Sequence, residues 1–288
     1  MRLGCISYIN SLPVDLGLLE GKILLPGAEF VSGFPSELNQ KIAANQVDLG
    51  PVSAFCYAQQ PELFYVLPDL SISSESGVRS VLLFSRYPLK ELAGKRIAIT
   101  GQGKTTPALL EVLCQSFYSF SPQLVFAEKQ ADPLANADAF VVIGNEALLM
   151  RQKHTDSSLI VTDLAEEWRL RTGLPFVFAV WVVRRDFFRE HSQEAIRAFT
   201  ALIASKHWGQ AHLPEVLTRA QSATGLTFDV LQDYFSCLSY NFDAQLQKAM
   251  LRFFEEAARL RLLSQVPALE FIPDTAAIRT HSILAGKS

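Results

Sequence analysis

The sequence has 288 residues, of which 49% are hydrophobic and 19% are charged. This balance is typical of a globular chain with enough core for one large domain or two ordinary ones. The net charge of −3, with Lys and Arg scattered along the chain, argues against a nucleic-acid partner, because phosphate recognition needs a concentrated positive face. The longest apolar stretches, such as residues 176–183, are too short to cross a bilayer, so no membrane partner is expected.

The N-terminus and the cysteines favour a cytoplasmic protein. A single Arg is followed at once by a predicted strand, without the long apolar region and cleavage site of a signal peptide. The cysteines lie far apart in apolar sequence, so we expect buried, reduced thiols rather than disulfides or a metal site. They are Cys5, Cys56, Cys114 and Cys237.

The first predicted strand ends in a polar turn. Apolar and small residues dominate Arg2 to Ile9 without helical spacing, which predicts a short buried strand. Ser11 can cap the helix that follows, and Pro13 fits its first turn. Ser7 and Asn10 then lie at the edge where open α/β sheets bind ligands. A polar turn without a ligand explains this stretch equally well when it is taken alone.

Strand and helix alternate in the next part of the chain. We predict strands over 28–33 and 46–53, and helices over 35–45 and 54–60. This rhythm indicates a parallel sheet with right-handed crossovers. Ser53, at the end of its strand, should therefore face the same crevice as the turn after the first strand.

A serine-rich link precedes another strand. Residues 67–74 contain few apolar anchors, whereas 77–85 is predicted to be a strand with Arg79 and Ser80 near its start. The Ser80 hydroxyl either faces the crevice or bonds neighbouring backbone, and the sequence leaves both open.

A glycine-rich turn opens the next helix. A strand over 95–100 is followed by Gly101-Gln102-Gly103-Lys104-Thr105-Thr106-Pro107 and a helix to about Phe117. A Walker motif requires a glycine five positions before Gly103, where this chain has Ala98, so we reject nucleotide binding. The free N–H groups at such a helix start still favour an anion, for example a carboxylate.

The later strands complete a second sheet and return to the first. Asn145 opens a short helix after one of these strands, and from residue 185 the chain is predicted to be helical. None of the five histidines follows a predicted strand end, so no histidine base is expected. The strands are predicted over 123–128, 139–144, 158–162 and 176–183, and the long helices over 187–208, 228–238 and 243–263.

This order of elements predicts an α/β protein with two lobes and a cleft between them. The first, larger lobe is predicted to comprise residues 1–86 and 184–288, with the C-terminal helices packed back onto it, and the second lobe residues 87–183. Two crossings, near 85–90 and 180–185, would form the hinge. The layout resembles the type 2 periplasmic-binding-protein fold, whose cleft closes over small polar ligands.

Six motifs between residue 3 and about residue 183 follow one another in the order found in one family. They are Ser7-Tyr8-Ile9-Asn10-Ser11-Leu12-Pro13, Pro35-Ser36-Glu37-Leu38, Asp48-Leu49-Gly50-Pro51-Val52-Ser53, Ser71-Ile72-Ser73-Ser74, Val78-Arg79-Ser80-Val81-Leu82-Leu83-Phe84-Ser85 and Thr172-Gly173-Leu174-Pro175-Phe176-Val177-Phe178-Ala179. Together they resemble the chorismate dehydratases of the futalosine route to menaquinone. Ser11 replaces the usual Thr, and the turn 101–106 is richer in glycine than its counterpart in the family, which leaves its ligand contacts open.

Two alternatives accompany this resemblance. The related 1,4-dihydroxy-6-naphthoate synthase shares the fold but uses a histidine after a second-lobe strand, where this chain has Ile143-Gly144-Asn145-Glu146. A non-catalytic small-molecule binding protein is the other alternative, and an export signal would favour it.

The resemblance implies a hydro-lyase that converts chorismate to 3-[(1-carboxyvinyl)oxy]benzoate without a cofactor or metal. We expect Asn10 and Ser80 to be catalytic, at the reacting end of the substrate. No His, Cys or carboxylate in the matched motifs suggests a base, so we hypothesise that the enolpyruvyl carboxylate of chorismate removes the proton. The residues expected to bind substrate are Ser7, Ser53, Arg79, Thr105, Thr106 and Asn145.

Overall fold

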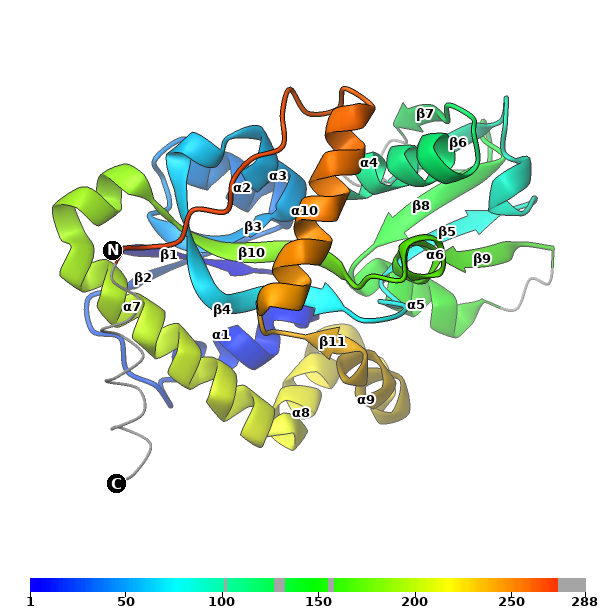
Figure 1. Ribbon diagram of the computed structural model, residues 1–288. Helices are drawn as coiled ribbons and strands as arrows, with labels where there is room; N and C mark the ends of the chain where they lie inside the picture. Colours follow the sequence, from blue (N-terminus) through cyan, green and yellow to red (C-terminus); the bar gives the residue numbers. More distant parts are fainter. Residues whose placement is uncertain (101–102, 127–132, 155–157, 274–288) are drawn as a thin grey trace.

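Two β-sheets lie side by side in the computed structural model, each flanked by helices (Figure 1). The structure describes residues 1–100, 103–126, 133–154 and 158–273. The first sheet has the order β11 (Leu238–Ser239), β4 (Phe64–Ser74), β10 (Phe176–Arg184), β3 (Leu49–Ser53), β1 (Arg2–Ile6) and β2 (Glu29–Gly33). The second has the order β7 (Gln123–Phe126), β6 (Arg96–Ile99), β8 (Ala139–Ile143), β5 (Val81–Ser85) and β9 (Ile160–Asp163).

The strand directions confirm the predicted parallel core of the first sheet. β1 pairs in parallel with β2 and with β3, so the carboxyl ends of these strands meet at one edge. β10 runs antiparallel to β3 and β4. In the second sheet β6 is parallel to β7 and β8, whereas β5 is antiparallel to β8 and β9.

Short helices connect the strands of each sheet. A 3-10 turn over Ile9–Ser11 precedes α1, and a π-helical turn over Leu113–Phe117 extends α4. Ser11 precedes α1 as predicted, but its hydroxyl donates to the Ile6 and Tyr8 carbonyls instead of capping the helix. The helices are α1 (Leu12–Leu19), α2 (Pro35–Ala43), α3 (Ala54–Gln59), α4 (Thr105–Val112), α5 (Asn145–Lys153) and α6 (Leu164–Thr172).

The chain crosses between the sheets one strand earlier than predicted, in both directions. β5, expected in the first lobe, lies between β8 and β9 of the second sheet. β10, expected at the end of the second lobe, lies in the first sheet. The crossings therefore fall between Ser74 and Val81 and between Asp163 and Phe176. A fully buried apolar strand satisfies either sheet, so its sequence does not show which sheet it joins. The lobe boundaries stay a prediction.

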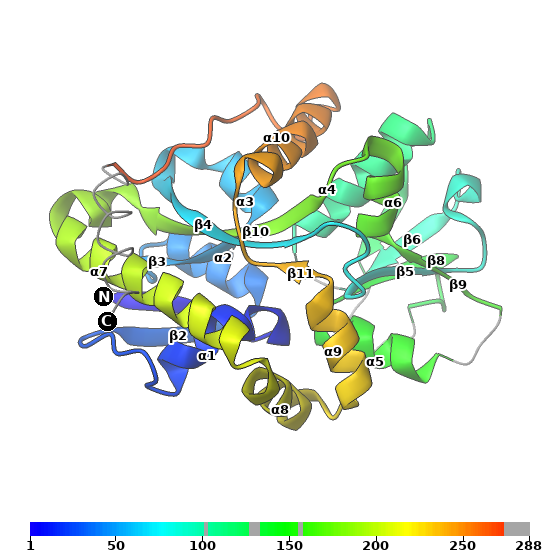
Figure 2. The same cartoon turned by 60° about the horizontal axis from the view of Figure 1, so that its bottom comes forward.

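Between residues 185 and 273 the chain forms four helices: α7 (Arg185–Ala211), α8 (Leu213–Thr224), α9 (Phe228–Ser236) and α10 (Ala244–Arg259). The sequence analysis did not predict α8. α7 packs beside α1 on one side of the first sheet, whereas α10 lies on the other side (Figure 2).

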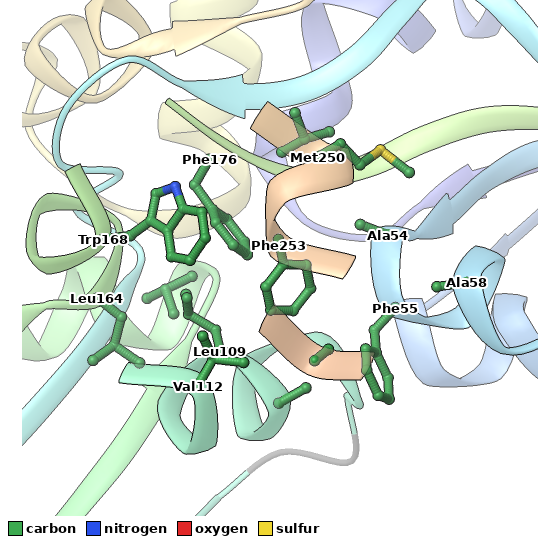
Figure 3. Close-up of a cluster of buried hydrophobic side chains, with 14 of the residues drawn as sticks. Ala54, Phe55, Ala58, Leu109, Val112, Leu164, Trp168, Phe176, Met250 and Phe253 are labelled. Carbon is green, nitrogen blue, oxygen red and sulfur yellow. The ribbon is translucent and has the colours of Figure 1, made fainter. Parts of the chain in front are cut away.

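The C-terminal helices were predicted to pack back onto the first lobe, and α10 contacts the second lobe as well. The Phe253 ring of α10 lies 6.2 Å from the Phe55 ring of α3 and 6.0 Å from the Trp168 ring of α6 (Figure 3). It also packs 5.0 Å from Phe176, where the chain re-enters the first sheet. This apolar cluster therefore joins the two lobes on the side of the first sheet opposite α7.

The described residues agree with the expected thiol chemistry. Cys5, Cys56 and Cys114 are buried, Cys237 is half-buried, and all four are free thiols. The predicted burial is therefore confirmed for three of the four cysteines and is incomplete at Cys237. No helix in the described ranges is both long and apolar enough to cross a membrane.

Candidate active site

A pocket of about 80 Å³ lies where the two sheets face each other. Its walls come from the ends of β1 and β3, the link before β5, the start of α4 and the end of β8. Ligand pockets typically measure about 300–1,000 Å³, so a substrate must separate the lobes in order to enter. The lining residues are Ile6, Tyr8, Asn10, Pro35, Pro51, Ser53, Ile72, Val78, Ser80, Val81, Gly103, Thr105, Thr106, Ile143, Gly144, Phe178 and Ala179.

The first lobe lines the pocket with polar side chains. The Asn10 Oδ1 atom is buried and has no hydrogen-bond partner among the described residues. The Ser53 hydroxyl accepts from Asn39 Nδ2 at 3.1 Å, and Asn39 Oδ1 accepts from the Ser53 N–H at 3.1 Å. Because Asn39 supplies a donor, the Ser53 hydroxyl keeps its own hydrogen for a ligand. Asn10 and Ser53 thus present hydrogen-bonding groups on one side of the pocket.

Ser80 belongs to the link between the lobes. Its hydroxyl lies 3.1 Å from the Tyr234 hydroxyl, and its carbonyl accepts from the Gly144 N–H at 2.7 Å. The preceding Arg79 has a φ of +62° and donates its N–H to Asp163 Oδ2 at 2.6 Å. A left-handed conformation at an arginine is uncommon and persists where surrounding contacts hold it.

The second lobe contributes the start of α4. Thr105 and Thr106 occupy the first two helical positions, whose N–H groups have no partner within a helix. Pro107 follows without an N–H, and the Ala108 N–H donates to the Lys104 carbonyl at 3.2 Å. Two adjacent N–H groups therefore remain at this helix start. Gly101 and Gln102 of the predicted turn lie outside the described residues.

Contacts between the lobes surround the pocket. Asn145 Oδ1 accepts from the Ile9 N–H at 3.1 Å, and Thr105 Oγ1 accepts from the Phe55 N–H at 3.1 Å. The Tyr8 ring lies against Gly144, where a Cβ atom would be 2.7 Å from the ring. Gly144 also has a φ of +67°, so a side chain at this position is excluded both by its backbone conformation and by Tyr8. These contacts describe a closed cleft.

The structure brings together most of the predicted site residues. Ser7 does not line the pocket and is exposed, with its N–H bonded to the Gly33 carbonyl. Arg79 also lies outside the lining, because its guanidinium pairs with Asp233 of α9. Asn145 makes the contact between lobes instead of lining the pocket. The five predicted residues in the lining are Asn10, Ser53, Ser80, Thr105 and Thr106.

Several lining residues were not predicted as site residues. Tyr8 lies inside the first motif, between two residues that were singled out, so the signal for it was available. Phe178 belongs to the last motif, and Gly144 is the last residue of a predicted strand. Phe178 and Gly144 contribute shape and close approach rather than ionisable chemistry, so no reactive side chain marks them in the sequence.

Among the lining residues that the structure describes, Tyr8 is the sole ionisable side chain. Burial, with a smaller effect from the charge of Glu146, raises the pKa of Tyr8, so its phenol is neutral near pH 7. Glu37 instead accepts from the Phe34 N–H, and Asp48 pairs with Arg2. No group of three or more His, Cys, Asp or Glu in the described ranges could hold a metal ion. The absence of a metal stays a prediction.

A larger depression of about 420 Å³ lies on the outer side of the second lobe, between α5 and the second sheet. Its lining includes Phe84, which stacks on Phe140 and meets His154 edge-on. It contains none of the predicted site residues, whereas five of them line the smaller pocket. We therefore assign the site to the smaller pocket.

Comparisons with known proteins extend this description. A family model described as menaquinone biosynthesis matches residues 1–259. The chain is 30% identical over 268 residues to a chorismate dehydratase from Thermus thermophilus, covering 88% of this chain and 96% of that protein. It is 25% identical to a 1,4-dihydroxy-6-naphtoate synthase of the same organism, covering 94% and 99%. The periplasmic aliphatic sulphonate binding protein of Escherichia coli has the same fold, with a TM-score of 0.66, 13% identity and coverage of 93% and 90%. The fold predicted from the order of elements is thereby confirmed.

Proposed function

The chain belongs to the menaquinone biosynthesis family, and we propose that it acts there as a chorismate dehydratase. The reaction removes one ring proton and the neighbouring hydroxyl from chorismate and gives 3-[(1-carboxyvinyl)oxy]benzoate, which makes the enzyme a lyase. Formation of the aromatic ring supplies the driving force. The observation that carries the proposal is a closed pocket lined by neutral hydrogen-bonding groups, together with two N–H groups at a helix start that have no partner among the described residues.

We propose that the start of α4 binds one carboxylate of chorismate. The N–H groups of Thr105 and Thr106 are adjacent and point out of the helix, where the helix dipole favours an anion. Lys104, directly before them, adds positive charge, although its ammonium group donates to Gln59 at 3.0 Å. Ser53, on the opposite wall, is suited to the second carboxylate because its hydroxyl retains a free hydrogen.

The reacting end of the substrate then faces Asn10 and Ser80. Asn10 cannot act as a base, since a neutral amide does not titrate near pH 7, but it can bond the leaving hydroxyl. Ser80 lies in the same pocket and can donate to that hydroxyl as negative charge develops on it. Both residues would orient the bond that breaks.

We propose that the substrate supplies the base. The enolpyruvyl carboxylate is tethered near the ring proton, and a closed cleft removes the water that normally solvates it, which raises its basicity. It takes the ring proton as the C–O bond to the hydroxyl breaks, and this proton with the departing hydroxide makes the water that is lost. The lining residues in the described ranges support this route because they include no carboxylate, histidine or cysteine.

The naphthoate synthase activity is the alternative within the family. The matched stretch after β8 has Gly144 and Asn145 in place of the histidine that the related enzyme uses. The identity to the synthase is also lower than that to the dehydratase. A cytoplasmic location stays a prediction.

The test is to incubate the purified protein with chorismate and follow the aromatic product by chromatography and ultraviolet absorbance. We expect turnover without added metal or cofactor. Absence of product from a folded protein that binds chorismate would overturn the proposed activity. Conversion of the naphthoate synthase substrate would support the alternative instead.

A second experiment tests the base. An analogue of chorismate whose enolpyruvyl carboxylate is an amide should bind to the enzyme and remain unreacted. Loss of all turnover in a single Asp, Glu or His variant that still folds and binds chorismate would contradict a substrate base.

A further inference from the structure

Tyr234 of α9 approaches the pocket from behind Ser80. Its side chain is 1% exposed, and its hydroxyl lies 3.1 Å from the Ser80 hydroxyl, 154 positions away in sequence. No other hydrogen-bond partner of this phenol occurs among the described residues. Tyr234 itself is absent from the pocket lining, whereas Ser80 belongs to it.

The direction of this hydrogen bond follows from the burial of both groups. A phenol has one hydrogen to donate, and leaving it unpaired inside the protein costs free energy. If Ser80 donated to Tyr234, the phenolic hydrogen would have no acceptor among the described residues. If Tyr234 donates, the phenolic hydrogen is paired with the Ser80 oxygen, and the Ser80 hydrogen is left to point into the pocket toward a ligand. Tyr234 is therefore the donor and Ser80 the acceptor.

We infer that Tyr234 is a positioning residue, which turns the Ser80 hydroxyl hydrogen toward the leaving hydroxyl of the substrate. This inference rests on the proposed function. Accepting a hydrogen bond also polarises the Ser80 O–H bond and strengthens it as a donor. The contribution appears when negative charge develops on the departing oxygen, so it affects the reaction step more than substrate binding.

Neighbouring contacts hold the same two link residues in place. Asp233, next to Tyr234 on α9, pairs with Arg79, next to Ser80. Asp163 accepts from the Arg79 N–H, and the Gly144 N–H donates to the Ser80 carbonyl. Two neighbouring residues of α9 thus bind two neighbouring residues of the link. These contacts explain how Arg79 keeps its left-handed backbone conformation.

The phenol keeps its proton over the working pH range. Burial raises the pKa of Tyr234 well above its usual value, and the hydrogen bond with Ser80 lowers it by less. The titratable groups that interact with it among the described residues include Cys237, Asp163, Tyr8 and Tyr240. Tyr234 is therefore a permanent donor rather than a proton carrier.

Tyr234→Phe tests the inference because it removes the hydroxyl and keeps the ring. We expect kcat to fall about tenfold, the usual size for one hydrogen bond, with KM changed less than about threefold. Tyr240→Phe is the matched control, since Tyr240 is also buried and its hydroxyl has no partner among the described residues. Its kcat should equal that of the wild type. Equal kcat in the two Phe variants would overturn the inference.

A double-variant cycle separates positioning from general support of the fold. In a Ser80→Ala background, Tyr234→Phe should change kcat less than about twofold, because the group it positions is already absent. A further tenfold loss in that background would overturn the inference. Turnover of chorismate by the wild type is measured first, so a failure of the proposed function is recognised separately.

Asp233→Asn provides a second variant if Tyr234→Phe does not fold. Asp233 is half-exposed, so this substitution releases Arg79 without opening the core. We expect kcat to fall about threefold in the wild-type background and to stay unchanged in the Ser80→Ala background. Equal losses in both backgrounds would contradict the positioning of Ser80 by α9.

Discussion

The two walls of the pocket use different parts of the chain. The first lobe presents side chains, those of Tyr8, Asn10 and Ser53, at the ends of β1 and β3. The second lobe lines it with the start of α4 and with Gly144, where the backbone of a helix start and of a glycine is available. Side-chain amides and hydroxyls distinguish one orientation of a substrate from another, whereas N–H groups at a helix start hold an anion. The comparison suggests that the first wall orients the substrate, with Asn10 at the reacting end and Ser53 at one carboxylate, whereas the second wall anchors the other carboxylate.

The buried carboxyl groups behind the two walls differ as well. Asp163, behind the second-lobe side, accepts from the N–H groups of Arg79, Ala165 and Glu166. Asp15 of α1, behind the first-lobe turn, is 2% exposed, and neither of its oxygens has a hydrogen-bond partner among the described residues. Burial raises the pKa of Asp15 to about 7. The first wall therefore rests on a carboxyl group that is easier to protonate.

The largest expected effect concerns Asp15. Between its ordinary pKa of 3.8 and the folded-state value of about 7, the folded protein keeps a proton that the unfolded chain releases. Stability therefore falls as pH rises through this interval, by up to about 4 kcal/mol. Asp15→Asn removes this titration. The free energy of unfolding of the variant, measured relative to that of the wild type, should therefore be roughly 3 kcal/mol more favourable at pH 8 than at pH 5. Urea unfolding at several pH values measures this difference.

Asp163→Asn provides the contrasting variant for that experiment. Burial raises the pKa of Asp163 too, but its hydrogen bonds with backbone N–H groups oppose the shift. Its replacement should destabilise the fold at every pH by removing an acceptor from those donors. If the free energy of unfolding changed with pH equally in the wild type and in Asp15→Asn, the proposed difference between the two carboxyl groups would be wrong.

The next effect separates the residues at the reacting end of the substrate from those at its carboxylates by their influence on kcat. Asn10→Ala and Ser80→Ala should each lower kcat by about 10²-fold or more, because they remove groups that orient the transition state. Ser53→Ala should mainly raise KM, since Ser53 is proposed to contact a carboxylate. Steady-state kinetics with chorismate measures both constants, and thermal unfolding checks that each variant folds. Wild-type kcat in Asn10→Ala or Ser80→Ala would remove that residue from the reacting end.

A smaller effect tests the backbone wall. Thr106→Pro removes one N–H from the start of α4 and should raise KM about tenfold, the usual size for a hydrogen bond to a charged group. A proline is tolerated in the first turn of a helix, so the fold should persist. Thr106→Ala is the control because it keeps the N–H, and its KM should change far less. Equal KM values in the two variants would mean that this N–H does not bind substrate.

Local patterns in the sequence were sufficient to predict the parts of the site that lie at the ends of strands. The strand, turn and helix around Asn10, and the position of Ser53 at the same edge, follow from parallel β/α alternation. The sheet joined by β5 did not follow, because its apolar residues fit either sheet. Tyr234 was not predicted either. Its relation to Ser80 depends on the packing of α9 across the link, and no local pattern encodes a contact over 154 positions.

The smallest expected effect concerns the contact between the two walls. Asn145 Oδ1 accepts from the Ile9 N–H at 3.1 Å, directly before Asn10. This bond joins the two walls only when the cleft is closed. Asn145→Ala removes it and therefore weakens closure, without removing any residue that lines the pocket. We expect KM to rise about fivefold with kcat nearly unchanged, because one hydrogen bond contributes about 1 kcal/mol.

Gln59→Ala is the matched control for that variant. Gln59 accepts from the exposed Lys104 ammonium across the same cleft, where water replaces a lost bond at little cost. Its KM should therefore stay within about twofold of the wild type. If Asn145→Ala instead lowers kcat by about 10²-fold, Asn145 contacts the reacting atoms in the closed enzyme. The second wall would then contribute a side chain to the reaction step, and the division between an orienting wall and an anchoring wall would be wrong.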